Sequence, residues 1–399
     1  MHDNFEAYVP IRQLAHGPKH HWFGYYDKEQ VDSSERYVLA MEVDFEHRTP
    51  RVDDTIGIGL IDIQENDKWR DLGSSSAWGW QQGCMLQWLP GSSREVIWND
   101  REGDSFISQI LNVETGECRR LAHPIYALSP DGRYAVGTDF RRIQAMRPGY
   151  GYAVENVGTP EKVPEDVYLY RLELNTGERH DLLSLAEIAA VPFQGQDISD
   201  GYHWFNHLLV SPDSERFIFL HRWRDANKTH ETSFHTRMFT VNKDGSDLYC
   251  LDDGDKMSHF IWRDPEHICA WAKPSGKDLE AFYLFKDKTS QVEAVGHGIM
   301  VYNGHNTYLP NTDNEWILND TYPLSDRFQE LYLYHVPSQK RVELGRFYAP
   351  PAYMGEWRCD LHPRSSQDGR TVIIDSAHDG NGRQLYALDI SNIVEAGWT

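Results

Sequence analysis

The sequence predicts an all-β protein, a seven-bladed β-propeller with four-stranded antiparallel blades. Short segments rich in β-branched and aromatic residues recur along the chain, and turns with Pro, Asp, Gly and Asn separate them. A turn that reads SPDG, or a degenerate form of it, returns in successive units. The units are about 40–55 residues long, which is the spacing of propeller blades.

Each unit reads as two pairs of strands joined by a loop. The clearest is the fourth, in which 206–224 predicts two strands about a tight turn and 236–253 predicts two more. Weaker copies lie at 25–73, 85–122, 126–183, 260–296, 307–345 and 362–391. The leading segment 5–14 is expected to add an outer strand to the last blade and so to close the ring. We interpret residues 1–399 as one domain.

Two long connections interrupt this pattern. The third unit carries the longest insertion, at about 138–167, and a further loop at 191–205 precedes the fourth unit. Loops of this length in a compact fold are usually functional, and we expect both to wall a pocket. A short helical pattern lies at 181–191.

Composition limits the classes of partner. Aromatic residues make up 13% of the 399 residues, which favours a large ordered core. The net charge of −22 argues against nucleic-acid binding, because phosphate neutralisation needs a basic face. We find no apolar run that could span a membrane and no signal peptide at the N-terminus. Five scattered cysteines suggest reduced thiols and a cytoplasmic location, or a periplasmic one if a leader peptide was removed.

One histidine recurs at the same position of four consecutive units. The four are His207, His259, His305 and His362, and each lies four residues before the same turn. In a propeller, side chains at equal register on neighbouring innermost strands meet at one mouth of the central channel. A single such histidine is more often structural, but four in register favour a functional cluster.

The last unit adds a carboxylate to this set. Asp360 lies two residues before His362, and residues two apart on a strand face the same side. Together with His305 of the neighbouring blade they form a typical set of ligands for a divalent metal. We therefore expect a metal at His305, Asp360 and His362, with Mn, Zn and Ca all open.

Arginines are candidates for binding an acidic substrate, because a guanidinium grips a carboxylate through two parallel hydrogen bonds. Arg142 and Arg147 lie in the insertion, and Arg222 and Arg237 lie in the fourth unit. For any single arginine, a salt bridge to one of the 61 acidic residues is the commoner role.

Aromatic and polar residues at the openings of the first three units are further candidates for contacts with a sugar. Tyr26 falls near the register of the histidines, Trp80 and Gln81 open the second unit, and His123 opens the third. Packing inside the blades is the alternative role of each. The motifs GxSxG and HExxH, a P-loop and a dinucleotide-binding fingerprint do not occur.

These residues resemble those of the seven-bladed propeller polysaccharide lyases, in particular oligogalacturonate lyase and, more loosely, the propeller ulvan lyases. The resemblance is best from about 203 to 391, and it includes TRMFTVNKDGS in the fourth unit and the openings SHFIW, GH and LHP of the next three. It implies that Arg237 and His259 serve catalysis and that His305 and His362 hold a metal. A further metal-ligating histidine of the family is replaced here by Asp360.

The reaction that the resemblance implies is β-elimination at a uronic acid in a small acidic oligosaccharide. The C5 proton lies next to a carboxylate, so a metal ion or an arginine must neutralise that carboxylate. His259 or His207 would take the proton, and Tyr26 or Tyr150 would protonate the departing C4 oxygen.

Two other functions stay open at this point. A propeller glycoside hydrolase would use carboxylates and release reducing sugar without an unsaturated product. A non-catalytic propeller that binds a glycan or a protein would need neither the metal nor the histidines. The histidines in register and the long insertion favour an enzyme. Linkage, endo or exo action and oligomeric state stay open.

Overall fold

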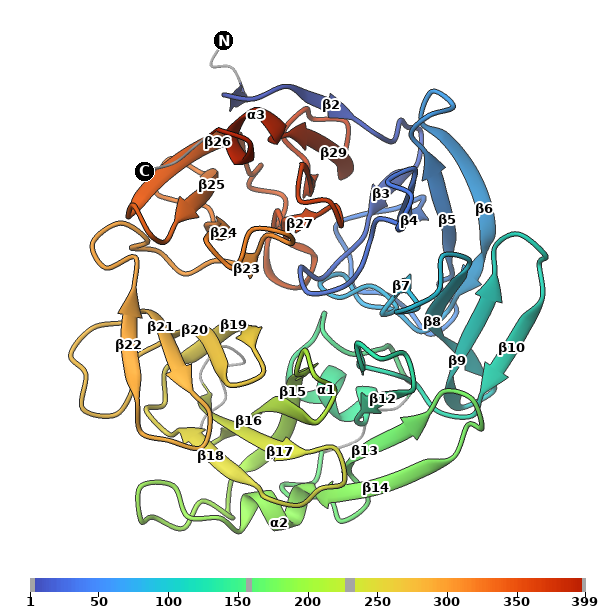
Figure 1. Ribbon diagram of the computed structural model, residues 1–399. Helices are drawn as coiled ribbons and strands as arrows, with labels where there is room; N and C mark the ends of the chain where they lie inside the picture. The colour runs from blue at the N-terminus through green and yellow to red at the C-terminus, as the bar shows by residue number, and fades with distance from the viewer. Residues whose placement is uncertain (1–3, 156–159, 227–233, 397–399) are drawn as a thin grey trace.

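The computed structural model describes residues 4–155, 160–226 and 234–396. Within these ranges the strands form seven antiparallel sheets arranged in a ring (Figure 1). Six of these sheets have four strands and one has five. The predicted seven-bladed β-propeller is therefore confirmed.

Blades 1 to 5 follow one another along the chain, and each runs from the axis of the ring to its rim. Blade 1 contains β3 (His20–Trp22), β4 (Tyr37–Val43), β5 (Ile56–Asp62) and β6 (Lys68–Ser75). Blade 2 contains β7 (Gln87–Trp88), β8 (Glu95–Glu102), β9 (Ser105–Asn112) and β10 (Cys118–Leu121). Blade 3 contains β11 (Ala127–Leu128), β12 (Tyr134–Gly137), β13 (Tyr168–Glu173) and β14 (Arg179–Ser184). Blade 4 contains β15 (Tyr202–Val210), β16 (Arg216–Arg224), β17 (His235–Asn242) and β18 (Tyr249–Asp252). Blade 5 contains β19 (Met257–Asp264), β20 (His267–Ala272), β21 (Ala281–Lys286) and β22 (Val292–Val295).

The last two blades both receive a strand from the N-terminal segment. Blade 6 contains β23 (Thr307–Tyr308), β24 (Trp316–Asp320), β25 (Phe328–His335) and β26 (Lys340–Tyr348), and blade 7 contains β27 (Arg364–Ser365), β28 (Thr371–Ser376) and β29 (Gln384–Asp389). β2 (Ile11–Gln13) pairs with β29 and closes the ring, as expected for segment 5–14. β1 (Phe5–Ala7) pairs instead with β26, which extends blade 6 in a way that the sequence did not indicate.

The hydrophobic core lies between the faces of adjacent blades. The central strands of a blade are covered on both faces, so β16 is buried along almost its whole length. Aromatic side chains fill these layers. Trp22, Trp78, Trp80, Trp88 and Trp204 are each at most 2% exposed. Burial of this size accounts for the high aromatic content.

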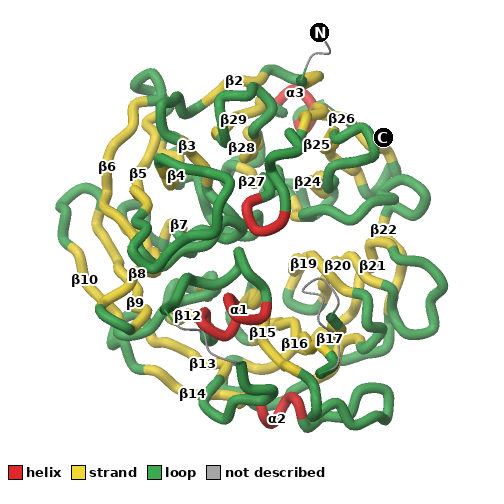
Figure 2. The backbone as a smooth tube through the Cα atoms, turned by 180° about the vertical axis from the view of Figure 1, so that it is seen from behind, coloured by secondary structure: helices red, strands yellow, loops and turns green. Residues whose placement is uncertain are grey.

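Short helices occupy the connections. α1 (Phe140–Met146) lies in the insertion of blade 3 and near the axis in Figure 2, and the Asp139 carboxylate caps its N-terminus. α2 (Leu185–Ala189) falls inside the predicted helical segment 181–191. The 3-10 turn η1 (Gly355–Trp357) precedes blade 7, and α3 (Ser391–Val394) follows β29. Among the described residues, we see no helix with the length and apolar character needed to cross a membrane.

Candidate metal centre and active site

The structure brings the four in-register histidines together beside the axis. The ring centroids of His259 and His305 are 4.1 Å apart, and those of His305 and His362 are 4.3 Å apart. His207 lies across the ring of Tyr25, whose centroid is 4.9 Å from His207 and 5.4 Å from His362. His207 and His259 lie on β15 and β19, whereas His305 and His362 lie in the loops just before β23 and β27.

Two of these histidines have a backbone conformation that favours glycine. The φ angles of His207 and His362 are 47° and 41°. A bulky residue in this region costs roughly 1–3 kcal/mol and occurs mostly at functional sites. At His207 the register of β15 also shifts between Asn206 and Leu208, and such a bulge redirects a side chain. Two members of the cluster therefore have a backbone conformation that is uncommon for histidine.

His305, Asp360 and His362 form the candidate metal centre. One ligand atom from each side chain lies within 4.8 Å of the other two. The Nε2 atoms of both histidines and Oδ1 of Asp360 are buried, and none of them has a hydrogen-bond partner among the residues that the structure describes. Leaving a buried polar atom unpaired costs about 1–3 kcal/mol, so three such atoms around one point need an explanation. Two imidazoles and a carboxylate fit a divalent cation.

Asp320, at the end of β24, holds His305 in place. Its carboxylate accepts hydrogen bonds from the backbone N–H of His305 at 2.7 Å and from Nδ1 at 2.9 Å, which leaves Nε2 facing the centre. A Cβ on Gly304 would lie 1.9 Å from the carbonyl oxygen of Asp320, so only glycine permits this close approach. Burial lowers the pKa of His305, but the Asp320 carboxylate outweighs burial and raises it. Burial and the charge of His305 hold the pKa of His362 well below its usual value.

Asp320→Asn is expected to weaken the binding of Mn²⁺ by about 10- to 100-fold, because a carboxylate behind a ligating histidine fixes its orientation and basicity. Isothermal titration of the metal-free protein with Mn²⁺ measures the change. Asp252→Asn, at a buried carboxylate on β18, is the matched control and should leave the affinity unchanged. Equal affinities for Asp320→Asn and the wild type would contradict the role of Asp320.

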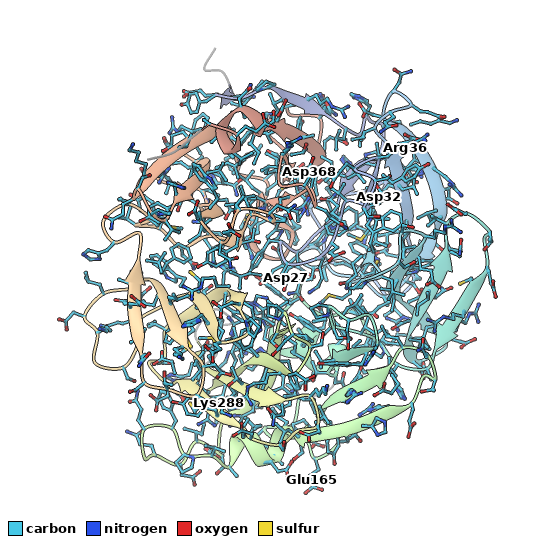
Figure 3. The ribbon with its side chains drawn as sticks, viewed as in Figure 1. Asp27, Asp32, Arg36, Glu165, Lys288 and Asp368 are labelled. Carbon is cyan, nitrogen blue, oxygen red and sulfur yellow. The ribbon has the colours of Figure 1, made fainter. Side chains whose placement is uncertain are left out.

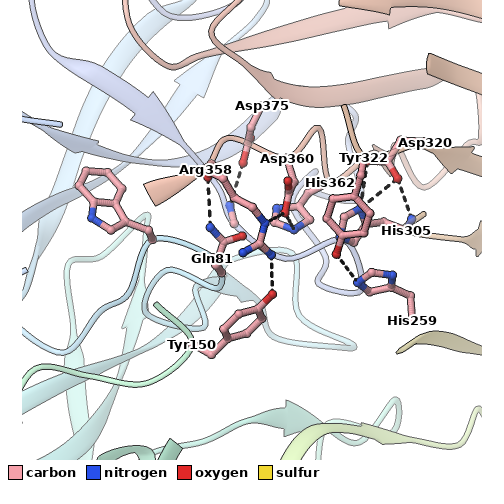
Figure 4. A network of polar contacts seen from close by, with 12 residues as sticks. Gln81, Tyr150, His259, His305, Asp320, Tyr322, Arg358, Asp360, His362 and Asp375 are labelled. Atoms are coloured by element: carbon pink, nitrogen blue, oxygen red, sulfur yellow. Dashed lines mark hydrogen bonds and ion pairs between the residues drawn. The ribbon is translucent and has the colours of Figure 1, made fainter. Parts of the chain in front are cut away.

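Arg358 connects the metal centre to Tyr150 (Figure 4). Its Nε donates to Oδ2 of Asp360 at 2.7 Å, and its Nη2 donates to the Tyr150 hydroxyl at 2.5 Å. Arg147 donates to the same hydroxyl at 3.2 Å. Burial raises the pKa of Tyr150, but the two guanidinium groups outweigh burial and lower it to about 7. Tyr150 can therefore exchange a proton near neutral pH.

Tight packing of the insertion places Tyr150 at this point. A Cβ on Gly151 would lie 2.3 Å from the carbonyl oxygen of Phe140, so the loop folds closely onto α1. The backbone N–H of Gln81 donates to the carbonyl of Gly149 at 3.0 Å. The Gln81 side chain donates to the carbonyl of Arg358 at 3.1 Å, while its Oε1 is buried and has no partner within residues 4–155, 160–226 and 234–396. Gln81 thus joins the insertion to the segment that carries the metal ligands.

His259 has both ring nitrogens near polar partners. Nδ1 lies 3.0 Å from the Asn303 amide oxygen, and Nε2 lies 3.3 Å from the Tyr322 hydroxyl. Burial, together with the charge of His305, holds the pKa of His259 well below its usual value. The imidazole is therefore neutral at pH 7 and keeps a lone pair.

His207 and Tyr26 lie in the same cluster, but their polar atoms are used within the fold. Nε2 of His207 is 2.9 Å from the Asp27 carboxylate, which lies near the axis in Figure 3, and its ring stacks on Phe260. The Tyr26 hydroxyl donates to the carbonyl of Phe260 at 2.8 Å and accepts from its N–H at 3.0 Å. The partners of His259, by contrast, are the neutral side chains of Asn303 and Tyr322.

Arg237 does not reach the cluster. It is 1% exposed, and its guanidinium donates to Nδ1 of His221 and to the carbonyl oxygens of Ile188 and Pro192. These bonds fasten the segment around α2 to blade 4. The arginines near Tyr150 are Arg147 and Arg358 instead.

Three further candidates for substrate binding lie away from the histidine cluster and contact other parts of the fold. Arg142 donates to three backbone carbonyls and clamps the insertion onto the start of blade 4. Trp80 is buried among the tryptophans of blades 1 and 2, and its Nε1 donates to the carbonyl of Arg48. His123 borders a separate cavity of about 180 Å³ on blade 3. None of the three has a contact with the histidine cluster in the part of the chain that the structure describes.

A cavity of about 270 Å³ opens beside the metal centre, and Arg358 and Asp360 form part of its wall. Arg327 and Tyr353 lie on its other sides. This volume is slightly below the usual range for small-molecule sites. A small ligand in this cavity would reach the Asp360 carboxylate directly.

Sequence reasoning missed Asp320, Tyr322 and Arg358. Arg358 stands two residues before Asp360, so the alternation that grouped Asp360 with His362 could have added it. Asp320 and Tyr322 belong to the strand that follows His305 and the loop after it. Only the structure shows that Asp320 contacts His305 and that Tyr322 contacts His259.

No protein-family model and no curated protein matches the sequence. Several solved structures match the fold. Oligogalacturonate lyase from Vibrio parahaemolyticus aligns with a TM-score of 0.66 over 98% of both chains at 15% identity. An oligogalacturonate lyase in complex with manganese aligns with a TM-score of 0.68 over 98% of this chain and 97% of that chain at 14% identity. The propeller domain of the trilobed protease from Pyrococcus furiosus aligns at 0.54 over 92% and 96% of the chains at 10% identity. The expected likeness to oligogalacturonate lyase is confirmed at the level of the fold.

Proposed function

We propose that the protein is a lyase that cleaves a small uronic-acid-containing oligosaccharide by β-elimination. One observation carries the proposal. Three unpaired metal-ligating atoms lie next to a phenol that is held between two guanidinium groups. In a β-elimination, a metal on the first would neutralise the carboxylate and the second would supply the proton for the departing oxygen. The fold shared with oligogalacturonate lyase supports the proposal.

His305, Asp360 and His362 would hold the divalent metal. Manganese is our first choice, because the similar lyase structure is a complex with manganese. When bound, the metal would neutralise the substrate carboxylate and the charge that develops on it.

In this proposal His259 and Tyr150 move the protons. The lone pair of the neutral His259 imidazole takes the C5 proton of the uronate. Tyr150 donates its hydroxyl proton to the departing C4 oxygen. Arg147 and Arg358 then stabilise the phenolate, because both already donate to that oxygen.

The pH dependence of kcat tests this division of roles. Tyr150 must be protonated, and its pKa is about 7, so kcat is expected to fall as the pH rises through about 7. His259 stays neutral over this range because its pKa is well below its usual value. Rates of unsaturated product formation across pH measure the profile. A kcat that rises through the same range would contradict the assignment and make the phenolate the base.

The decisive experiment is a product assay with the Mn²⁺-loaded protein and a panel of uronate oligosaccharides. β-Elimination yields a product that absorbs in the ultraviolet and has the mass of an unsaturated uronate. Reducing ends without this absorbance would indicate a hydrolase instead. Binding without any product would indicate a non-catalytic propeller.

A further inference from the structure

Two of the three candidate metal ligands lie in a loop and not on a strand. Residues 357–363, which we call the ligand loop, run from the last residue of η1 to the start of β27 and contain Asp360 and His362. Backbone outside helices and sheets must find other partners for its polar groups, and a buried carbonyl without a partner is costly. The groups that donate to this loop therefore decide where its side chains lie.

Arg383, which immediately precedes β29, reaches the ligand loop with its guanidinium group. Its Nη2 donates to the carbonyl of Trp357 at 2.9 Å and to the carbonyl of Arg358 at 3.2 Å. Its Nη1 donates to the carbonyl of Trp80, in the loop before β7, at 3.4 Å. One side chain of blade 7 thus joins the start of the ligand loop to the segment that opens blade 2.

The guanidinium of Arg383 has a fixed orientation in its buried place. The side chain is 3% exposed, and its Nε lies 3.6 Å from Oε1 of Glu46, a residue of blade 1 that is 4% exposed. The other oxygen of Glu46 accepts a hydrogen bond from the Tyr353 hydroxyl at 2.6 Å. The guanidinium carbon also lies 4.9 Å from the centroid of the Trp80 ring. A buried cation needs a counter-charge and hydrogen-bond acceptors, and Arg383 has both.

The backbone around Arg383 is fixed as well. The N–H of His21 donates to the carbonyl of Arg383 at 2.9 Å, which connects this segment to β3. A Cβ on Gly382 would lie 2.0 Å from Nδ1 of His20, and the φ angle of Gly382 is 81°, so only glycine suits this position. The side chain of Arg383 therefore extends from a firmly held point toward the ligand loop.

The residue that Arg383 holds by its carbonyl is Arg358. The Arg358 guanidinium contacts the Asp360 carboxylate and the Tyr150 hydroxyl, as described above. The hydrogen bonds of Arg383 go to backbone carbonyls. Arg383 therefore acts on the metal centre through the course of the loop.

We propose that Arg383 is a positioning residue, which fixes the ligand loop so that Asp360 completes the metal centre with His305 and His362. The inference rests on the metal centre of the proposed function. Arginine suits this role because its planar fork presents several donors in fixed directions, whereas lysine has one flexible ammonium group.

Titration of the metal-free protein with Mn²⁺ tests this role without requiring turnover. Arg383→Gln is expected to bind Mn²⁺ about 10-fold more weakly than the wild type, because groups that orient metal ligands contribute about 10- to 100-fold to metal affinity. Arg383→Lys should lose less, because the lysine keeps the charge and one donor group. Equal affinities for Arg383→Gln and the wild type would overturn the inference.

Arg216→Gln is the matched control for Arg383→Gln. Arg216 lies at the start of β16, its side chain is 11% exposed, and its Nε donates to the Asp287 carboxylate at 2.8 Å. Its loss also breaks an ion pair between an arginine and a carboxylate, but this pair joins blades 4 and 5. Arg216→Gln should therefore lower the melting temperature and leave the affinity for Mn²⁺ unchanged. A loss of affinity equal to that of Arg383→Gln would mean that general loosening, and not positioning, is measured.

Double variants show through which ligand Arg383 acts. In an Asp360→Asn background, Arg383→Gln should weaken Mn²⁺ binding by less than about twofold, because the carboxylate that it positions is already gone. In an Asp320→Asn background the full loss of about 10-fold should remain, because Asp320 acts on His305 instead. A full loss in the Asp360→Asn background would overturn the inference. Melting curves check folding, and Arg383→Lys replaces Arg383→Gln under the same criteria where the glutamine variant does not fold.

The two proposals fail in different ways. A wild type that binds Mn²⁺ with the expected dependence on Arg383, but forms no unsaturated product, would leave the positioning role and remove the lyase. A wild type that forms unsaturated product, together with an Arg383→Gln variant of unchanged affinity for Mn²⁺, would leave the lyase and remove the positioning role.

Discussion

Tyr150→Phe is expected to lower kcat for unsaturated product formation by about 10²- to 10⁴-fold, which is the usual contribution of a positioned general acid. Phenylalanine keeps the ring between Arg147 and Arg358 and removes only the hydroxyl that both arginines contact. Steady-state kinetics with the Mn²⁺-loaded protein measure the effect. KM should change far less than kcat, because the hydroxyl acts on the departing oxygen and not on the substrate carboxylate.

Tyr152→Phe is the matched control for Tyr150→Phe. Tyr152 lies two residues further along the same insertion, is also fully buried, and accepts a hydrogen bond from Asn99 at 2.7 Å. Its loss should reduce stability by about 1 kcal/mol and leave kcat unaffected. The proposed role of Tyr150 is untenable if the two variants have the same kcat.

His305→Ala is expected to remove stoichiometric manganese and to lower kcat by about 10³-fold or more, since charge stabilisation by a bound metal is worth several kcal/mol. The substitution takes away one of the three unpaired ligand atoms and frees the Asp320 carboxylate. Elemental analysis of the purified protein and the ultraviolet assay provide independent measurements. Chelator treatment of the wild type should produce the same loss, and added Mn²⁺ should reverse it.

A second ligand variant and a control complete this test. His362→Asn suits the left-handed backbone at this position, because asparagine tolerates a positive φ better than alanine does. His180→Ala, at a partly exposed histidine on β14, should change neither metal content nor activity. Full manganese occupancy in both His305→Ala and His362→Asn would refute the metal centre.

Local patterns in the sequence predicted the fold and grouped the three residues of the candidate metal centre. Turn residues return at blade spacing because every blade needs the same tight connections. In the sequence, the expected alternation of a strand grouped Asp360 with His362, and equal register in the neighbouring blade added His305. In the structure Asp360 and His362 lie in the loop before β27, and His362 has a φ of 41°, so the turn of this loop and not strand alternation brings them together. The structure shows these three ligand atoms within 4.8 Å of one another.

The roles of individual arginines could not be read from the sequence in this way. Adjacent residues of a strand point to opposite faces, and in a propeller both faces are buried between blades. The hydrophobic pattern of a strand therefore does not show which neighbouring segment a given arginine on that strand contacts. Arg237 faces the segment around α2, whereas Arg222 faces Phe234 and Arg147.

The sequence by itself determined the seven repeated blades and the histidine register, because both follow from a repeat along the chain. It also indicated the N-terminal strand that closes the ring, because a ring of blades leaves no open sheet edge. Only the tertiary structure decided the surroundings of each polar side chain. Asp320 behind His305, Arg358 between Asp360 and Tyr150, and Asp27 on His207 each join segments that lie apart along the chain. Hydrogen bonds and charge interactions depend on the distance between groups in space, not on their separation along the chain. The lowered pKa of Tyr150 therefore follows from how the insertion packs against the segment that carries Arg358.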